Sequence, residues 1–380
     1  MSALSKTSDY HLVKTQALNP NATAFLDLVR AIAANLVLLD HGTAIFKTDI
    51  SIHTGSLGVC MFFILSGFLI MQSSLLRLRR SEPHFGPYMI DRIARIFTAY
   101  VPVLIIVAVV NASGNLGSWS QAGVSVGPTA FVGNLLMLQD YPIFQAAQRL
   151  IGDTFYIRPY NAAEPFWTIP IEFWTYVVFG LVFFGLIARE RIGFIGLAAG
   201  LIALPVVVWN AVAGGGNGLT LVWMIGATGG YVWVSAWHRS THRRDIGLVV
   251  GAVAAVCLLG RGVKFGWNFQ DFGLVLCLTL LVFASISILD DMPSLPAWPR
   301  RAAMLLASYS YTLYLVHNTV LILILRLTAG GVVERFAFPI ALLAAHVVAI
   351  FLYLLFERHY RHVGTWLKRN FVQSGPRVVH

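Results

Sequence analysis

Long apolar segments separated by short polar stretches run through the whole sequence. A helix crosses a hydrocarbon core about 30 Å thick with about 20 apolar residues, and ten segments of this chain are long enough. They cover residues 25–46, 57–76, 89–111, 166–188, 192–212, 219–237, 246–264, 271–289, 303–326 and 336–357. The pattern predicts an all-α integral membrane protein, a bundle of about ten transmembrane helices.

Composition excludes two other classes of protein. Of the 380 residues, 57% are hydrophobic and only 12% charged, whereas a soluble globular domain carries about 25% charged residues. Disorder is excluded by the same apolar content.

The three cysteines lie in apolar runs with no metal-ligand spacing, so neither a disulfide framework nor a metal site is predicted. The first apolar segment has no cleavage motif before it and is interpreted as an uncleaved span.

The net charge of +10 indicates orientation and does not indicate nucleic-acid binding. If the N-terminus is cytoplasmic, 20 of the 27 Lys and Arg residues fall in cytoplasmic segments. The seven on the opposite face are Lys47, Arg149, Arg158, Arg261, Lys264, Arg326 and Arg335. Such a bias follows the positive-inside rule. We therefore expect a multi-pass protein of the cell inner membrane with both termini in the cytoplasm.

The polar connections suggest three regions. Residues 1–24 form a cytoplasmic N-terminal segment, residues 25–357 the membrane domain, and residues 358–380 a cytoplasmic tail.

A long outer segment, residues 112–165, lies between the third and fourth spans and is rich in Gly, Ser, Asn and Pro. Within it, Thr129 to Leu138 is apolar but too short to span, so an interfacial or re-entrant helix is expected. Whether this segment binds sugar through Trp119 and Tyr141 is left open.

The first span carries ionisable residues, which are expensive in a membrane and mark candidate functional sites. Arg30 and His41 are eleven residues apart, so they share one helix face with about 16 Å of rise between them. Asp27 precedes Arg30 by three residues and is placed to pair with it, whereas Asp40 points away from His41. The alternative is a snorkelling Arg30 and a His41 that only bonds to a neighbouring helix.

Two further motifs lie in the second and third spans. Ser66 and Gly67 in the second span are small enough for close approach of a helix or of a ligand chain. Arg92 and Arg95 share a helical face at the start of the third span, and paired guanidiniums suit phosphate oxygens. Helix packing alone would explain the first motif, and lipid-phosphate anchoring would explain the second.

The fourth and ninth spans place polar groups in the outer half of the membrane. Glu172 follows Pro170 there, and a carboxylate at such a depth needs a partner or a role in acid–base chemistry. Ser310, Tyr314 and His317 occupy one face of the ninth span at offsets of four and three. The sequence thus predicts a second imidazole and a phenol near the level of His41.

These residues carry a resemblance to a known family. In the first three spans the motifs are FLDLVRA, with ten residues between its Arg30 and His41, then GVCMFFILSGFLI, and Arg-Ile-Ala-Arg at 92–95. Further along are Trp167 with Glu172 and Tyr176, SYSYTLYLVH ending at His317, and Phe356-Glu357-Arg358. In this order, from about residue 20 to 362, the chain resembles the membrane acyltransferase-3 family. It departs from the family pattern at Thr98, usually proline, and at Thr168, usually serine.

The resemblance implies a ten-span O-acyltransferase that moves an acyl group, most often acetyl, from cytoplasmic acyl-CoA to a hydroxyl of an envelope or exported polysaccharide. Arg30 and His41 would be the essential pair, Arg92 and Arg95 would hold the CoA phosphates, and Glu172 would lie on the acceptor side. The donor would be acetyl-CoA or another acyl-CoA, used as a substrate. No permanently bound cofactor is expected.

The mechanism expected from the sequence joins these residues. His41 would act as general base on the acceptor hydroxyl or as a nucleophile that takes the acyl group. Glu172 would orient or charge-balance the imidazole of His41, and Arg30 would help Arg92 and Arg95 to hold the CoA. The remaining candidates are Ser66 and Gly67 beside the pantetheine arm, catalytic His317, and the site-lining Phe63, Trp167, Tyr176, Ser310 and Tyr314.

One rival from another class is a secondary transporter of a small anion or metabolite, since intramembrane His, Arg and Glu also form substrate pathways. Transporters often contain paired Gly/Pro-broken spans, and the sequence offers no matching pair. The expected partners are acyl-CoA, a glycan or other hydroxyl acceptor, and membrane lipid. The acceptor, the acyl group and the oligomeric state stay open.

Overall fold

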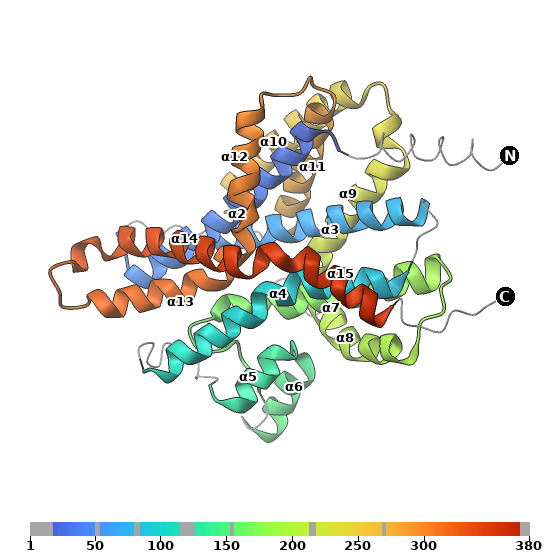
Figure 1. Ribbon diagram of the computed structural model, residues 1–380. Helices are drawn as coiled ribbons and strands as arrows, with labels where there is room; N and C mark the ends of the chain where they lie inside the picture. Colours follow the sequence, from blue (N-terminus) through green and yellow to red (C-terminus); the bar gives the residue numbers. More distant parts are fainter. Residues whose placement is uncertain are drawn as a thin grey trace. The chain divides into compact units, whose positions relative to one another are not determined.

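The computed structural model describes residues 18–49, 54–79, 84–114, 126–152, 156–212, 218–267 and 271–372, and in these ranges the chain forms helices and no strand (Figure 1). The long helices are α2 (Pro20–Phe46), α3 (Gly55–Arg79), α4 (Phe85–Ala112), α7 (Thr168–Gly180) with its π-helical continuation η3 (Leu181–Ile187), α8 (Phe194–Val212), α9 (Leu219–Ser235), α10 (Arg243–Phe265), α11 (Phe272–Asp290), α13 (Ser310–Thr328) and α14 (Ala337–Leu355). Shorter elements are α5 (Pro128–Leu135), α6 (Pro142–Ile151), η2 (Glu164–Trp167), η5 (Trp237–Arg239), α12 (Ala297–Ser308), η6 (Glu334–Phe336), η7 (Glu357–His359) and α15 (Tyr360–Phe371). Trp119, named above as a possible sugar contact, lies outside the described residues, as do Lys6, Lys14, Arg80 and Arg377, which are among the 20 basic residues counted above as cytoplasmic.

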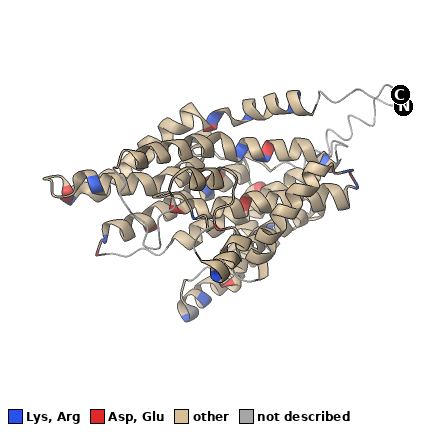
Figure 2. Cartoon of the chain, turned by 90° about the horizontal axis from the view of Figure 1, so that it is seen from below, with Lys and Arg blue, Asp and Glu red and all other residues tan. Residues whose placement is uncertain are grey.

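Ten helical segments of the described chain are long and apolar enough to cross a membrane. Figure 2 shows how few Lys, Arg, Asp and Glu residues interrupt the helical ribbon. Large apolar side chains face outward: Phe194 is 84% exposed, Leu201 75% and Val263 81%. Apolar surface of this extent is compatible with lipid as the solvent, and helices satisfy their own backbone hydrogen bonds there. The chain is an all-α multi-pass membrane protein, as predicted.

The chain forms two compact units. The first comprises Met1–Leu36, Thr54–Pro83 and Asn217–Ala307, and the second comprises Val37–His53, His84–Gly216 and Ser308–His380. Helix α2 contributes its N-terminal part to the first unit and its C-terminal part to the second.

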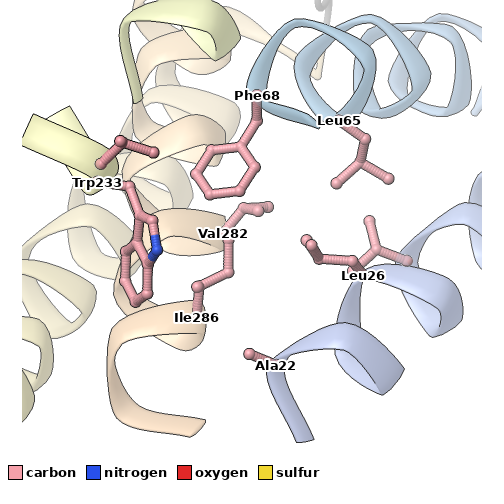
Figure 3. Packing of buried hydrophobic residues seen from close by; sticks show 9 residues of the cluster. Ala22, Leu26, Leu65, Phe68, Trp233, Val282 and Ile286 are labelled. Carbon is pink, nitrogen blue, oxygen red and sulfur yellow. The ribbon is translucent and has the colours of Figure 1, made fainter. Parts of the chain in front are cut away.

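The first unit has an apolar core made by four helices. Leu26 of α2, Phe68 of α3, Trp233 of α9 and Ile286 of α11 are all buried and belong to one cluster (Figure 3). Burial of large side chains from four separate helices fixes their mutual packing at close to crystal-like density.

Glycines let α3 and α9 approach backbone to backbone. A Cβ added at Gly226 would lie 2.8 Å from Cα of Ile64, and one added at Gly230 would meet the carbonyl of Phe68. Contact distances this short leave no room for any side chain. Small residues at a crossing are a common way to bring membrane helices together, because van der Waals packing drives their association.

Replacing Gly226 by leucine is therefore expected to lower the free energy of unfolding by about 1–3 kcal/mol, the usual range for overpacking. The matched control is Gly260→Leu on α10, where the described structure places no heavy atom within 4 Å of an added Cβ. Unfolding of both variants in detergent micelles measures the difference. Equal stability of the two variants would contradict the close α3–α9 packing.

The second unit is organised around α4, which packs against α7, α13 and α15. Tyr100 in the middle of α4 is fully buried, and its hydroxyl donates to the backbone oxygen of Asn134 in α5 at 3.0 Å. The amide of Gln139 donates to the Tyr100 hydroxyl at 3.3 Å and to the Phe166 carbonyl at 3.2 Å. These bonds attach the outer segment to α4 and to the start of the fourth span.

The observed helices agree with the predicted spans to within a few residues, with one larger difference. The ninth span was expected to begin at residue 303, yet α12 ends at Ser308 and α13 begins at Ser310. Tyr309 between them has φ −106° and ψ 6°, outside the α-helical region. Apolar content alone does not reveal a break between two consecutive helices. The outer segment does contain a short helix, α5, where an apolar stretch too short to span was noted.

Candidate active site

Two imidazoles meet in the second unit. His41 lies near the end of α2, and its Nδ1 is 3.2 Å from Nε2 of His317 on α13. The ring centroids are 5.0 Å apart. His317 is fully buried, whereas His41 is only partly buried. The structure therefore brings together the two histidines that the sequence placed on separate spans, and it leaves one of them partly exposed.

The Nδ1 edge of the His317 ring is hydrogen-bonded to its own helix, α13. Its Nδ1 lies 2.8 Å from the carbonyl oxygen of Tyr314 and 3.1 Å from that of Leu313. The Tyr314 ring also packs against the imidazole, with centroids 5.9 Å apart. The ring of His317 thus has a fixed orientation, with its other nitrogen directed at His41.

A buried amide beside these histidines was missed in the sequence. Asn318 donates from Nδ2 to the carbonyl of Ala162 at 2.9 Å, and Thr319 donates its hydroxyl to the same oxygen at 2.9 Å. The Asn318 side chain also lies near the His41 imidazole. Ala162 has φ +62°, which is unusual for a residue with a Cβ and is held here by the two donors. An Asn directly after a histidine in an apolar span was the available signal.

The start of the fourth span is bonded to α13 by hydroxyl groups. Tyr314 donates to the carbonyl of Pro165 at 3.0 Å, and its oxygen lies 2.7 Å from Oγ1 of Thr168. Thr168 stands where the family pattern has serine, and the hydroxyl that makes this contact is retained. Ser310, at the first position of α13, is also buried. Tyr314 and Ser310 therefore shape the interior of the second unit.

Glu172 is one turn before Tyr176 on α7, and the Tyr176 hydroxyl donates to its carboxylate. The carboxylate is partly buried and has the partner that its depth in the membrane requires. Trp167, at the end of η2, is partly buried as well. The expected role of Glu172 in orienting His41 stays a prediction, because this contact with Tyr176 does not address it.

Arg92 and Arg95 differ in their surroundings although they share a face of α4. Arg95 is bound to the fully buried Glu357, with Nη1 2.7 Å from Oε1, and its guanidinium lies 5.0 Å from the centre of the Tyr360 ring. The Arg92 guanidinium lies 5.9 Å from the centre of the Tyr88 ring, and within the described residues no carboxylate lies within ion-pair distance of it. Arg92 is therefore the more available cation of the two.

The other candidates belong to the first unit. Arg30 pairs with Asp27 at 3.2 Å, as its spacing predicted. The Ser66 hydroxyl accepts from Nε1 of Trp223 at 3.1 Å, and a Cβ added at Gly67 would meet the backbone carbonyl of Trp223. Helix packing accounts for Gly67 in this structure. Phe63 is buried in the same helix, and donor binding by this set is left as a prediction.

The outer segment has its own polar cluster. The Tyr156 hydroxyl donates to Oδ1 of Asp140 at 2.5 Å and accepts from Gln145 at 3.3 Å. Burial raises the pKa of the Asp140 carboxyl, and burial together with the Asp140 charge raises the pKa of Tyr156 to about 12. Tyr141 is nearly buried, and its hydroxyl donates to the Ile202 carbonyl at 2.9 Å. These bonds order the segment around its two short helices.

Fold and site define a multi-span membrane protein whose second unit holds an imidazole pair among amide, hydroxyl and carboxylate groups. A family model described as an acyltransferase domain matches residues 23–358, nearly the whole chain. The chain belongs to the acyltransferase-3 family, and it is a membrane acyltransferase. No curated protein and no solved structure matches it.

Proposed function

We propose that the protein transfers an acyl group, acetyl in the first instance, from cytoplasmic acyl-CoA to a hydroxyl of an envelope or exported polysaccharide. The observation that carries the proposal is the His41 imidazole, held 3.2 Å from a buried second imidazole in a chain of the acyltransferase-3 family. An imidazole of this kind suits proton transfer from a hydroxyl near neutral pH. The protein would lie in the inner membrane with both termini in the cytoplasm.

In the proposed reaction, His41 takes the proton of the acceptor hydroxyl while that oxygen bonds to the thioester carbonyl carbon. The carbon–sulfur bond breaks, CoA leaves as a thiolate, and the proton passes from His41 to the sulfur. The products are the O-acyl ester and free CoA, so atoms and charge balance. In the alternative that the sequence leaves open, His41 first takes the acyl group itself and the hydroxyl then attacks the acyl-imidazole.

Arg92 is the proposed contact for the donor phosphates. From the positive-inside distribution, its guanidinium is expected at the cytoplasmic boundary of the membrane. Among the described residues, no carboxylate pairs with it. Guanidinium–phosphate contacts are charge-assisted and often bidentate. Arg30, Ser66 and Gly67 belong to the first unit, and their part in donor binding is carried over from the sequence.

The direct test uses purified protein in detergent or nanodiscs with acyl-labelled acetyl-CoA and a panel of oligosaccharides. Labelled ester and free thiol should appear in equal amounts. Mass spectra of envelope glycans from cells with and without the protein identify the acceptor. Uptake of a labelled anion into proteoliposomes without release of thiol would favour the transporter alternative.

Replacing Arg92 by glutamine is expected to raise KM for the acyl-CoA donor by about 10- to 100-fold, because a hydrogen bond to a charged group contributes about 1.5–3 kcal/mol. The effect on kcat should be smaller, since the guanidinium binds the donor in the ground state as well as in the transition state. Arg244→Gln, at an exposed position of α10, is the control. An unchanged KM in the Arg92 variant would remove this residue from the donor site.

A further inference from the structure

The contacts of His317 fix which of its nitrogens carries hydrogen. Nδ1 lies within hydrogen-bond distance of two backbone carbonyl oxygens, those of Leu313 and Tyr314. Carbonyl oxygens only accept, so Nδ1 must be the N–H nitrogen. A neutral imidazole has a single N–H, and Nε2 of His317 is then a bare acceptor. Protonation of both nitrogens would place a charge on a side chain that is fully buried, which is costly without an anionic partner.

The state of His317 determines that of His41. Nε2 of His317 faces Nδ1 of His41 at 3.2 Å, and one of the two nitrogens must donate. Because Nε2 of His317 is bare, Nδ1 of His41 supplies the hydrogen. Neutral His41 consequently has its lone pair on Nε2, the nitrogen that is not engaged by His317. The hydrogen on Nδ1 of His41 is thus fixed by His317 alone, without a contact to a carboxylate among the described residues.

We infer that His317 is a positioning residue that holds His41 in its Nδ1–H tautomer and so makes Nε2 of His41 the nitrogen that accepts the proton in the reaction. His41 Nδ1–H donates to Nε2 of His317, and His317 Nδ1–H donates to the α13 carbonyls. When Nε2 of His41 takes the proton of the acceptor hydroxyl, the hydrogen on Nδ1 stays where it is. The consequence for catalysis rests on the proposed function, whereas the tautomer itself does not.

Nitrogen NMR of the purified protein with 15N-labelled histidine tests the tautomer directly. The sequence has 11 histidines, and subtraction of the His41→Asn spectrum assigns the His41 signals. In the wild-type protein, Nδ1 of His41 should show the shift of an N–H nitrogen and Nε2 that of a bare nitrogen. The reverse pattern would overturn the inference, and this measurement needs neither a donor nor an acceptor.

Two variants connect the tautomer to the rate. His317→Phe keeps a ring of similar size but removes the acceptor, so the Nδ1–H signal of His41 should weaken and kcat should fall about 100-fold, within the usual contribution of general-base catalysis. His317→Gln supplies an amide oxygen near the place of Nε2 and should recover about tenfold of that loss. KM for the donor should stay unchanged in both. His346→Phe is the control, because His346 contacts Tyr309 and lies outside this pair.

The outcomes separate this inference from the proposed function. If His41-dependent transfer from acyl-CoA occurs but His317→Phe leaves both the tautomer and kcat as in the wild type, the inference is wrong and the proposed function stands. If the tautomer is as stated but no acceptor receives an acyl group from acyl-CoA, the proposed function is wrong and the role of His317 in setting the tautomer stands.

Discussion

His41→Ala is expected to lower the rate of acyl transfer by about 10²- to 10⁴-fold, the range in which a positioned acid–base group contributes. Alanine removes the partly buried imidazole that is hydrogen-bonded to the buried His317. Initial rates of labelled ester formation from acetyl-CoA by the purified variant measure the loss. Donor KM should change little, because the proposed role of His41 is in the chemical step.

Acylation of the wild-type protein in the absence of an acceptor distinguishes a base from a nucleophile. If His41 is a nucleophile, wild-type protein mixed with donor alone should gain one acyl group and release one equivalent of CoA. If it is a general base, neither occurs without a hydroxyl acceptor. Intact-protein mass spectrometry reads the difference. His346→Ala is the matched control for loss of an intramembrane imidazole, and wild-type turnover by His41→Ala would disprove the mechanism.

Hydropathy predicted the architecture well because the bilayer imposes a length on every spanning helix. The start and end of α3, α4 and α11 differ from the predicted spans by only a few residues. Local breaks were not predictable in this way. The change from α12 to α13 occurs at Tyr309, inside the segment 303–326 that was predicted as one span, and is set by backbone geometry and not by hydropathy.

The candidate site was predictable where its contacts are local. Arg30 with Asp27 and Tyr176 with Glu172 follow from offsets of three and four on a helix. The contact between His41 and His317 joins residues 276 positions apart. The sequence identified both histidines because each is polar in an apolar span, but helical spacing holds no information on which spans are neighbours.

The distinction between Arg92 and Arg95 illustrates the same limit. Their spacing gives them one face of α4, and the sequence treated them as equivalent phosphate ligands. The carboxylate that separates them, Glu357, lies 262 positions from Arg95, at the end of the last predicted span. One arginine of the pair is committed to an ion pair by a residue that no local pattern connects to it.

The Arg95–Glu357 pair leads to the second large effect. Glu357→Leu should lower the free energy of unfolding by about 1.5–3 kcal/mol, because it removes a fully buried carboxylate that is hydrogen-bonded to a guanidinium whose side chain is 30% exposed. It also removes the acceptor of two bonds from Thr312, whose backbone nitrogen and hydroxyl lie 3.2 Å and 2.5 Å from Oε2. Unfolding of the purified protein in mixed micelles gives the value.

The control breaks a more exposed ion pair on the same helix. Asp91→Asn removes the partner of Lys368, a pair whose side chains are 24% and 31% exposed, and should cost about 0–1 kcal/mol. A Glu357→Leu variant no less stable than Asp91→Asn would show that the buried pair does not hold α4 to η7.

The double variant Arg95→Met with Glu357→Leu separates the two roles open to Arg95. Replacing both partners of a buried ion pair by apolar residues is often neutral, so stability should return toward the wild-type value except for the bonds lost at Thr312. If Arg95 serves the fold alone, donor KM of this variant should match the wild type, while Arg92→Gln raises it. If Arg95 also binds donor phosphate, KM should rise in the restored double variant as well, because methionine offers no charge to the donor.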